Sequence, residues 1–284
     1  MKNFTLLSLS FLLFFAGSIS PYQIFTSDGQ KTDFEQIVNQ AKDCDVVFFG
    51  ELHNSAIAHW LQYELTKSLF ELKGNQLVLG AEMFEADQQL LMNEYLGNII
   101  SESSFEKEAR LWPNYQTDYK PLVLFAKEKN LPFIATNIPR RYASVVAKYG
   151  LDTLDNLLDK EAKKYIARLP IAFDPELPGY KNMVHQGGGP GMKYIAQAQA
   201  IKDATMAYFI EKNLKKNSIF LHFNGAYHTN NYEGIIWYLK KLKPGLKILT
   251  ITTEEQENIE QLEQDKLKLA DFIIVVKESM TKTH

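Results

Sequence analysis

"VVFFGELHNS", residues 46–55, places four apolar residues directly before Gly50, Glu51, Leu52 and His53. An uninterrupted apolar run of this kind is typical of a parallel strand that helices cover on both faces. A glycine immediately after the strand lets the backbone turn sharply, so that the side chains that follow can face back across the strand end. The stretch therefore predicts a buried parallel strand that ends at a functional site.

Two other segments repeat this pattern of an apolar run, a glycine and then polar residues. Gln76–Leu79 leads to Glu82, and Ser218–Phe223 leads to His228. The carboxyl ends of parallel strands share one edge of the sheet, which is where ligands bind in open α/β folds. The residues expected to meet at this edge are Glu51, His53, Glu82 and His228.

The remaining periodicity predicts an α/β fold. Further apolar runs indicate strands, and 3.6-residue patterns indicate helices between them. The expected strands are Asp45–Phe49, Gln76–Leu79, Ser218–Phe223, Leu131–Ala135, Leu246–Thr250 and Phe272–Val276, and the expected helices are Asn54–Lys73, Pro139–Tyr149 and Met192–Lys215. We predict a largely parallel central sheet flanked by helices. Residues of about 84–130 and 151–191 are expected to be helical insertions that cap the C-terminal edge of the strands.

The first eighteen residues are expected to be a signal peptide and not part of the fold. Lys2 precedes an apolar run at about residues 6–16, and small residues follow, with cleavage expected after Ser18. An uncleaved anchor is the alternative, although the run is short for a membrane span. Residues 19–284 would then form a single exported domain in the periplasm or cell envelope.

Composition excludes several classes of protein. Cys44 is the sole cysteine, so there is no intrachain disulfide, and it lies too far along the chain to be a lipid-attachment cysteine. The formal net charge is −3, which gives no reason to expect a nucleic-acid partner. The sequence contains no Gly-x-Ser-x-Gly nucleophile elbow, no dinucleotide or phosphate-loop glycine motif and no Cys-x-x-Cys-His haem attachment motif.

Three uses remain open for the residues at the strand ends. Glu51, His53, Glu82 and His228 could bind a divalent metal such as Mn, Co or Zn, or could act as general acids and bases. They could also form a structural hydrogen-bond network. His59 would either join this group or be solvated.

The two insertions are rich in aromatic residues. Trp112, Tyr115 and Tyr119 lie in the first, and Tyr180, Met183 and His185 lie in the second. Tyrosine and histidine are both axial ligands of haem iron, and aromatic surroundings can bury a porphyrin. The alternative is an ordinary aromatic core of the cap.

Five segments resemble ChaN-type haem-binding uptake proteins of the Tiki and erythromycin esterase-like superfamily. In chain order they are VVFFGELHNSAIAHW, LVLGAEMFEADQQ, WPNYQTDYKPLVLFAKEKNLPFIATNIPRR, AQAQAIKDATMA and HFNGAYH, and the resemblance covers about residues 34–240. It implies non-covalent haem binding, as stacked pairs in a homodimer, for iron uptake in the cell envelope. An outer-membrane haem receptor or envelope transport components would be partners.

The same resemblance implies candidate site residues. Tyr115 and Tyr119 are the expected haem ligands, and His185 is the second choice. Related branches are metal-dependent proteases or esterases, in which Glu51, His53, Glu82 and His228 would be catalytic. A binding module with an idle polar edge is a third alternative. Unlike many members of the family, this sequence has no lipid-accepting cysteine.

Overall fold

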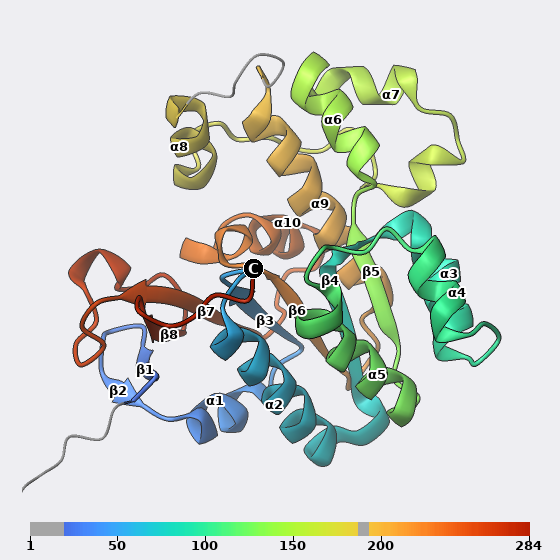
Figure 1. Ribbon diagram of the computed structural model, residues 1–284. Helices are drawn as coiled ribbons and strands as arrows, with labels where there is room; N and C mark the ends of the chain where they lie inside the picture. The colour runs from blue at the N-terminus through green and yellow to red at the C-terminus, as the bar shows by residue number, and fades with distance from the viewer. Residues whose placement is uncertain (1–19, 187–192) are drawn as a thin grey trace, which may run out of the picture.

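The central sheet has eight strands in the residues that the computed structural model describes, 20–186 and 193–284. Their order is β2-β1-β8-β7-β3-β6-β4-β5, and only the pairs β1–β2 and β1–β8 are antiparallel. The bounds are β1 Tyr22–Thr26, β2 Lys31–Thr32, β3 Val46–Glu51, β4 Leu77–Glu85, β5 Phe133–Asn137, β6 Ile219–Gly225, β7 Ile248–Gln256 and β8 Phe272–Lys277. The predicted fold class is confirmed (Figure 1). The expected signal peptide lies outside the described residues.

Helices cover both faces of the sheet, as the continuous apolar strands require. In β3, Val47 and Phe49 pack in one core with α1, α2 and α5, whereas Val46 and Phe48 pack in a second core with α6, α9 and α10. Figure 1 shows these two helical layers below and above the sheet. The bounds are α1 Phe34–Ala41, α2 Ala56–Lys73, α3 Gln89–Leu96, α4 Glu102–Glu108, α5 Lys120–Lys129, α6 Arg140–Tyr149, α7 Leu154–Leu157, α8 Pro178–Gln186, α9 Ile195–Asn213 and α10 Ile235–Leu242.

Two strands were not predicted, and β4 and β7 end six residues later than predicted. The antiparallel strands β1 and β2, of which β2 forms the edge of the sheet, lack a long apolar run. β4 continues to Glu85 with an irregular register after Ala81, so Glu82 lies inside the strand and not beyond its end. β7 extends to Gln256. The sheet therefore carries part of the site on its strands, in addition to the turns after them.

Helix α2 begins a few residues after the end of β3, where Glu51 and His53 lie. The helix begins after Ser55, whose Oγ accepts a hydrogen bond from the backbone N–H of Ala58 (3.3 Å), and it ends at Gly74. The helix expected from Asn54 therefore starts at Ala56, with Ser55 and not Asn54 as its cap. Serine and asparagine are comparable caps, so only the local backbone conformation decides between them.

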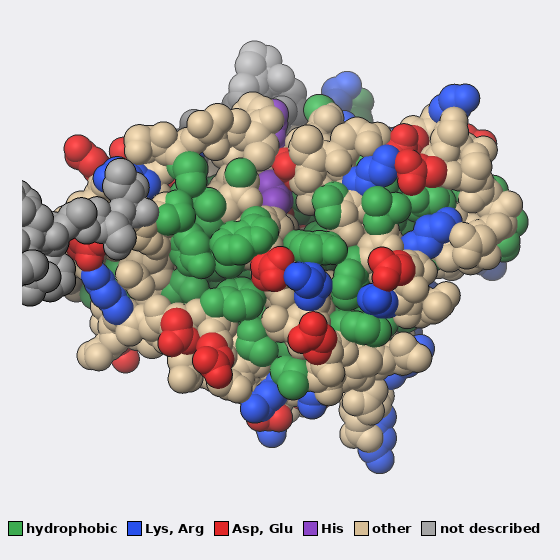
Figure 2. Space-filling view, turned by 60° about the horizontal axis from the view of Figure 1, so that its bottom comes forward, with side chains coloured by type: hydrophobic (Ala, Val, Ile, Leu, Met, Phe, Trp, Pro, Cys, Tyr) green, Lys and Arg blue, Asp and Glu red, His purple; other side chains and the backbone are tan. Residues whose placement is uncertain are grey.

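The two insertions form helices on opposite sides of the sheet edge. The first contains α3, α4 and a π-helical turn at Tyr115–Tyr119 that leads into α5, and the second contains α7 and α8. Apolar side chains gather over the α1, α2 and α5 side of the molecule in Figure 2, where Trp60 of α2 is 49% exposed. Within residues 20–186 and 193–284, no helix combines the length and apolar character needed to cross a bilayer.

Candidate functional site

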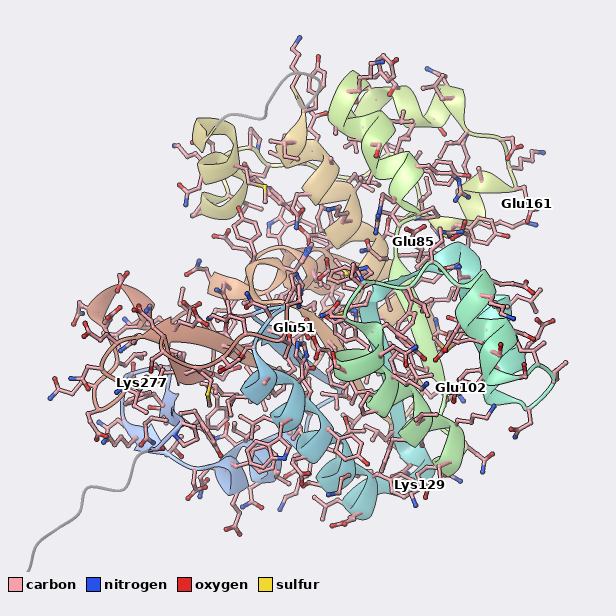
Figure 3. All side chains as sticks on the ribbon, viewed as in Figure 1. Glu51, Glu85, Glu102, Lys129, Glu161 and Lys277 are labelled. Atoms are coloured by element: carbon pink, nitrogen blue, oxygen red, sulfur yellow. The ribbon has the colours of Figure 1, made fainter. Side chains whose placement is uncertain are left out.

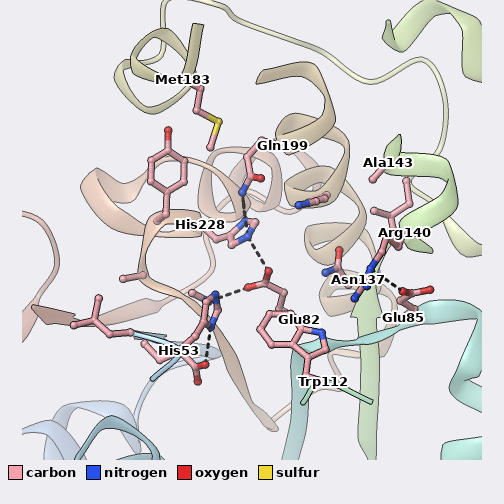
Figure 4. A pocket seen from close by; sticks show the side chains of 17 residues that line it. His53, Glu82, Glu85, Trp112, Asn137, Arg140, Ala143, Met183, Gln199 and His228 are labelled. Carbon is pink, nitrogen blue, oxygen red and sulfur yellow. Dashed lines mark hydrogen bonds and ion pairs between the residues drawn. The ribbon is translucent and has the colours of Figure 1, made fainter. Parts of the chain in front are cut away.

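A cavity of about 550 Å³ lies at the carboxyl ends of β3, β4 and β6, beneath α6, α8 and α9. This volume is within the usual range for small-molecule and cofactor sites. Figure 4 shows the cavity from close by, and Figure 3 shows Glu51 and Glu85 in the middle of the molecule, between the sheet and the cap. The described residues that line it include all four predicted edge residues, Glu51, His53, Glu82 and His228. Their predicted convergence is confirmed.

Glu51 and His53 form one half of the polar floor. The Nδ1–H of His53 donates to Glu51 Oε1 (2.9 Å), and the imidazole packs edge-on against Trp112 with ring centroids 5.0 Å apart. The His53 side chain is 40% exposed, whereas that of Glu51 is fully buried. His53 is thus a histidine held in one orientation by a buried carboxylate, with part of its ring open to the cavity.

Buried donors fix the carboxylate of Glu51. Tyr119 donates its hydroxyl to Oε1 (2.7 Å), and Gln62 donates its amide N–H to Oε2 (2.5 Å). His59 lies beside them, 6% exposed, and its Nε2–H donates to the backbone oxygen of His53 (3.0 Å). Of the two alternatives for His59, the structure supports the one in which it joins the site network.

Glu82, His228 and Asp203 form the other half of the floor. His228 donates from Nε2 to Glu82 Oε1 (3.1 Å) and from Nδ1 to Asp203 Oδ1 (2.5 Å). The backbone N–H of Gly225 also donates to Glu82 Oε2 (2.8 Å). On the far side, Tyr180 donates its hydroxyl to Asp203 Oδ2 (2.7 Å). One imidazole is therefore held between two buried carboxylates.

The electrostatics of this cluster keep His228 protonated. Burial lowers its pKa, but the charges of Glu82 and Asp203 raise it more, to about 10. Burial raises the pKa of Glu82, but the His228 charge and hydrogen bond lower it well below its usual range. For Asp203 burial outweighs His228, and the pKa is raised. An imidazolium fixed in this way contributes charge and geometry to the site, and it is a poor proton acceptor near neutral pH.

His53 differs from His228 in its exposure. Burial lowers the pKa of His53, whereas its hydrogen bond to Glu51 and the charge of Glu82 raise it, and the raising effects are larger. Because part of the ring is exposed, His53 can exchange its proton with solvent or with a ligand. Of the two histidines at the sheet edge, His53 is the one suited to proton transfer.

Gly225 leaves room for the His53 ring, which would have to shift if a Cβ were present. A Cβ there would lie 2.8 Å from His53 Nε2 and 3.6 Å from Glu82 Oε2. At Gly50 a Cβ would lie 2.9 Å from the backbone Cα of Ala226. Both glycines therefore allow close approach of neighbouring segments. The predicted turn immediately after the strand was wrong for them, because Gly50 lies inside β3 and Gly225 is the last residue of β6.

The aromatic residues expected to bind haem iron lie outside the cavity lining. Tyr119 is 1% exposed and donates to Glu51; Tyr115 is 2% exposed and packs against Phe84 and Phe105, and its hydroxyl has no partner among the described residues. Burial raises the pKa of both tyrosines well above the usual range. The side chain of His185 lies outside the described part of the chain. Their assignment as ligands stays a prediction.

The strand-edge residues do not fit a divalent metal in this arrangement. Glu82 and His228 bind each other, and Glu51 is occupied by Tyr119 and Gln62. Within the part of the chain that the structure describes, no group of three or more His, Cys, Asp and Glu residues could hold a metal ion. The observed contacts match the third use considered for these residues, a hydrogen-bond network, around one partly exposed histidine.

The cavity lining does fit a planar, amphipathic cofactor. Trp112, Ile138, Ala143 and Met183 supply apolar contacts, and the cations Arg140 and Lys202 stand on the wall formed by α6 and α9. Buried apolar surface with a few charged groups is the usual composition of cofactor sites. The residues present are therefore compatible with haem.

Sequence reasoning missed the residues that lock the network from the helices. Asp203 is 1% exposed and Gln62 is 0% exposed, and both lie on helices whose other inward residues are mostly apolar. A lone acid on such a face is unfavourable unless it is paired. That signal was present for Asp203 in the segment AQAQAIKDATMA, but the sequence does not identify His228 as its partner.

Fold and cavity together define a class: an α/β protein whose cofactor-sized site lies at the carboxyl edge of a parallel sheet, under a helical cap. A family model for haem-binding uptake, Tiki superfamily, ChaN, matches residues 37–239. The chain belongs to this family.

Solved structures agree with this fold. ChaN of Campylobacter jejuni, with cofacially bound haem, is 17% identical and has a TM-score of 0.63, with 90% of this chain and 97% of that chain covered. A succinoglycan biosynthesis protein is 12% identical with a TM-score of 0.54, with 89% and 93% covered. Erythromycin esterase EreC is 12% identical, with 89% and 82% covered, but its TM-score of 0.49 supports no argument. No curated protein matches the chain.

Proposed function

We propose that this protein binds haem non-covalently in the cavity at the sheet edge and takes part in haem or iron uptake in the cell envelope. Membership of the haem-binding uptake family supports haem as the ligand. The observation that carries the proposal is the cavity of about 550 Å³, with apolar contacts and two cations above a fixed polar floor. Bound haem would supply an iron centre, and the chain's own residues would orient the ring and exclude water.

Three side chains of the types that ligate haem iron reach the cavity. They are His53, Met183 and Tyr227, in addition to His228, whose two ring nitrogens are already held by Glu82 and Asp203. Tyr227 is 44% exposed, and its hydroxyl donates to the backbone oxygen of Gly179 at the start of α8. Ligation by Tyr115 or Tyr119, as the family resemblance implies, would need the buried hydroxyl to become accessible.

Location and assembly belong to the same proposal. The apolar N-terminal segment would direct export to the periplasm or envelope, where an outer-membrane haem receptor or transport components would exchange haem with the protein. The cofacial haem described for the Campylobacter jejuni structure favours a homodimer that shares stacked haems. Sedimentation of the purified protein with and without hemin tests this point, and a monomer in both conditions contradicts it.

Titration with hemin tests haem binding itself. We expect a saturable shift of the Soret band, and we expect His53→Ala, Met183→Leu or Tyr227→Phe to change its position if that side chain is the ligand. Tyr115→Phe and Tyr119→Phe are examined in parallel, because a change confined to one of them would support the ligands implied by the family. A titration without saturation defeats the proposal.

One observation favours a second function, hydrolysis by general base catalysis. The Glu51–His53 pair resembles the carboxylate-oriented imidazoles that activate water or a nucleophile. Screening ester and peptide substrates with the wild type and with His53→Ala tests it, alongside metal analysis for Mn, Co and Zn. If His53→Ala retains every activity detected, or none is detected, this function is rejected.

A further inference from the structure

The carboxylates that line the cavity are already held by other protein groups. Glu51 and Glu82 have the contacts described above. Glu85 of β4 accepts a hydrogen bond from Arg110 Nε (2.9 Å), an arginine from the first insertion. None of the three therefore has its charge free to attract a cationic ligand.

Two cations on the opposite wall are less engaged. Arg140, the first residue of α6, has a side chain that is 76% exposed, and its Nε lies 3.9 Å from the carboxylate of Glu85, which already binds Arg110. Lys202 of α9 is half-buried, and among the described residues no carboxylate lies within 4.0 Å of its Nζ. The charge left without a close partner in this cavity is positive and stands on one side.

A third polar group lies beside these cations. Asn137, the last residue of β5, also lines the cavity, and Figure 4 shows it next to Arg140. Its Oδ1 is buried without a hydrogen-bond partner in the described part of the chain. A buried amide oxygen with no partner is costly, and because it only accepts, a donor such as water completes it. The Nδ2–H₂ of the same side chain is the group that can donate to an acidic ligand.

We propose that Arg140, Lys202 and Asn137 form an anion subsite that recognises the carboxylate arms of a planar, apolar ligand. The inference rests on the proposed haem function and adds which wall of the cavity receives the acidic groups. Guanidinium and ammonium groups bind carboxylates through charge-assisted hydrogen bonds, which are stronger than neutral ones. The apolar body of the ligand is left to Trp112 and Met183.

Iron-free protoporphyrin IX and its dimethyl ester separate this subsite from iron ligation. The ester keeps the ring and removes both negative charges. We expect the wild type to bind the diacid about tenfold more tightly than the ester, measured by porphyrin fluorescence. Lys202→Gln and Arg140→Gln should each weaken the diacid about fivefold and leave the ester nearly unchanged, because these cations are partly exposed.

Matched controls lie on the same two helices. Lys212→Gln in the last turn of α9 and Lys148→Gln in the last turn of α6 remove equal charges away from the cavity lining, and both should bind like the wild type. Equal affinity for diacid and ester, or equal losses in the controls, overturns the subsite. If hemin still binds in that case, the proposed function stands; if the wild type binds neither hemin nor the diacid, both proposals fall.

Discussion

Replacing Asp203 with asparagine should destabilise the protein, and the loss should depend on pH. The change keeps the shape of the side chain and removes one of the two charges that hold the His228 imidazolium. Asp203 is 1% exposed, so no water can replace the lost carboxylate. The amide oxygen of asparagine can still accept a hydrogen bond from Tyr180 or from His228. The main loss is therefore the negative charge of Asp203.

The magnitude follows from the pKa of His228. The increase from 6.5 to about 10 corresponds to roughly 5 kcal/mol of favourable interaction at about 1.4 kcal/mol per unit. Glu82 and Asp203 share this interaction, and Asp203 makes the shorter contact, 2.5 Å against 3.1 Å. Burial disfavours the Asp203 charge and raises its pKa, which offsets part of the gain. We therefore expect Asp203→Asn to lower the free energy of unfolding by about 2 kcal/mol near neutral pH.

The sign of the pH dependence follows from linkage. A folded-state pKa raised above 6.5 gives stability that is fully present below about pH 6.5 and is lost as the pH rises through about 10. Asp203→Asn lowers the folded-state pKa of His228. The variant therefore loses the stability that protonated His228 contributes at a lower pH than the wild type does. The difference in unfolding free energy between the two proteins should shrink toward zero as the pH approaches that of His228 deprotonation.

Urea unfolding followed by circular dichroism, from about pH 6 to about pH 10, measures this difference. Asp28→Asn serves as the control, because Asp28 is exposed and lies far from the cluster in sequence. A difference that stays constant with pH would refute the reasoning, and so would a variant as stable as the wild type.

Two pairs of substitutions give further predictions. Gly50→Ala should cost about 1–3 kcal/mol in urea unfolding, because the new Cβ meets backbone, whereas Gly225→Ala should cost less and instead shift the ring NMR signals of His53, which can move. The opposite ranking would contradict the geometry. Tyr119→Phe should lose about 1–2 kcal/mol, because it removes a donor from a buried carboxylate, whereas Tyr115→Phe should be neutral or slightly stabilising, because its hydroxyl has no partner among the described residues. Equal losses in the two variants would show that the hydroxyl contacts do not control stability.

The strands were predicted well where both faces are buried. Asp45–Phe49 and Ser218–Phe223 read as apolar runs, and they match β3 and β6 to within two residues at each end. β1 and β2 were missed because they are short, five and two residues, and neither contains a long apolar run. The extension of β4 through Glu82 was also not predicted, because a glycine followed by a polar residue is typical of a turn at the end of a strand.

The sequence alone determined that glycine, carboxylate and imidazole would lie in or just after the C-terminal parts of the strands, and that parallel strands would bring them to one edge. Both results follow from continuous apolar runs that are followed by glycine and polar residues, a pattern that is visible within each short segment. Only the tertiary structure decided how the charges pair, because Asp203 and His228 lie on different elements and meet through the packing of α9 against the sheet. It also decided that Lys202 would face the cavity and that Tyr115 would not. Side-chain burial depends on which helices lie above each strand end, and no local pattern in the chain encodes that.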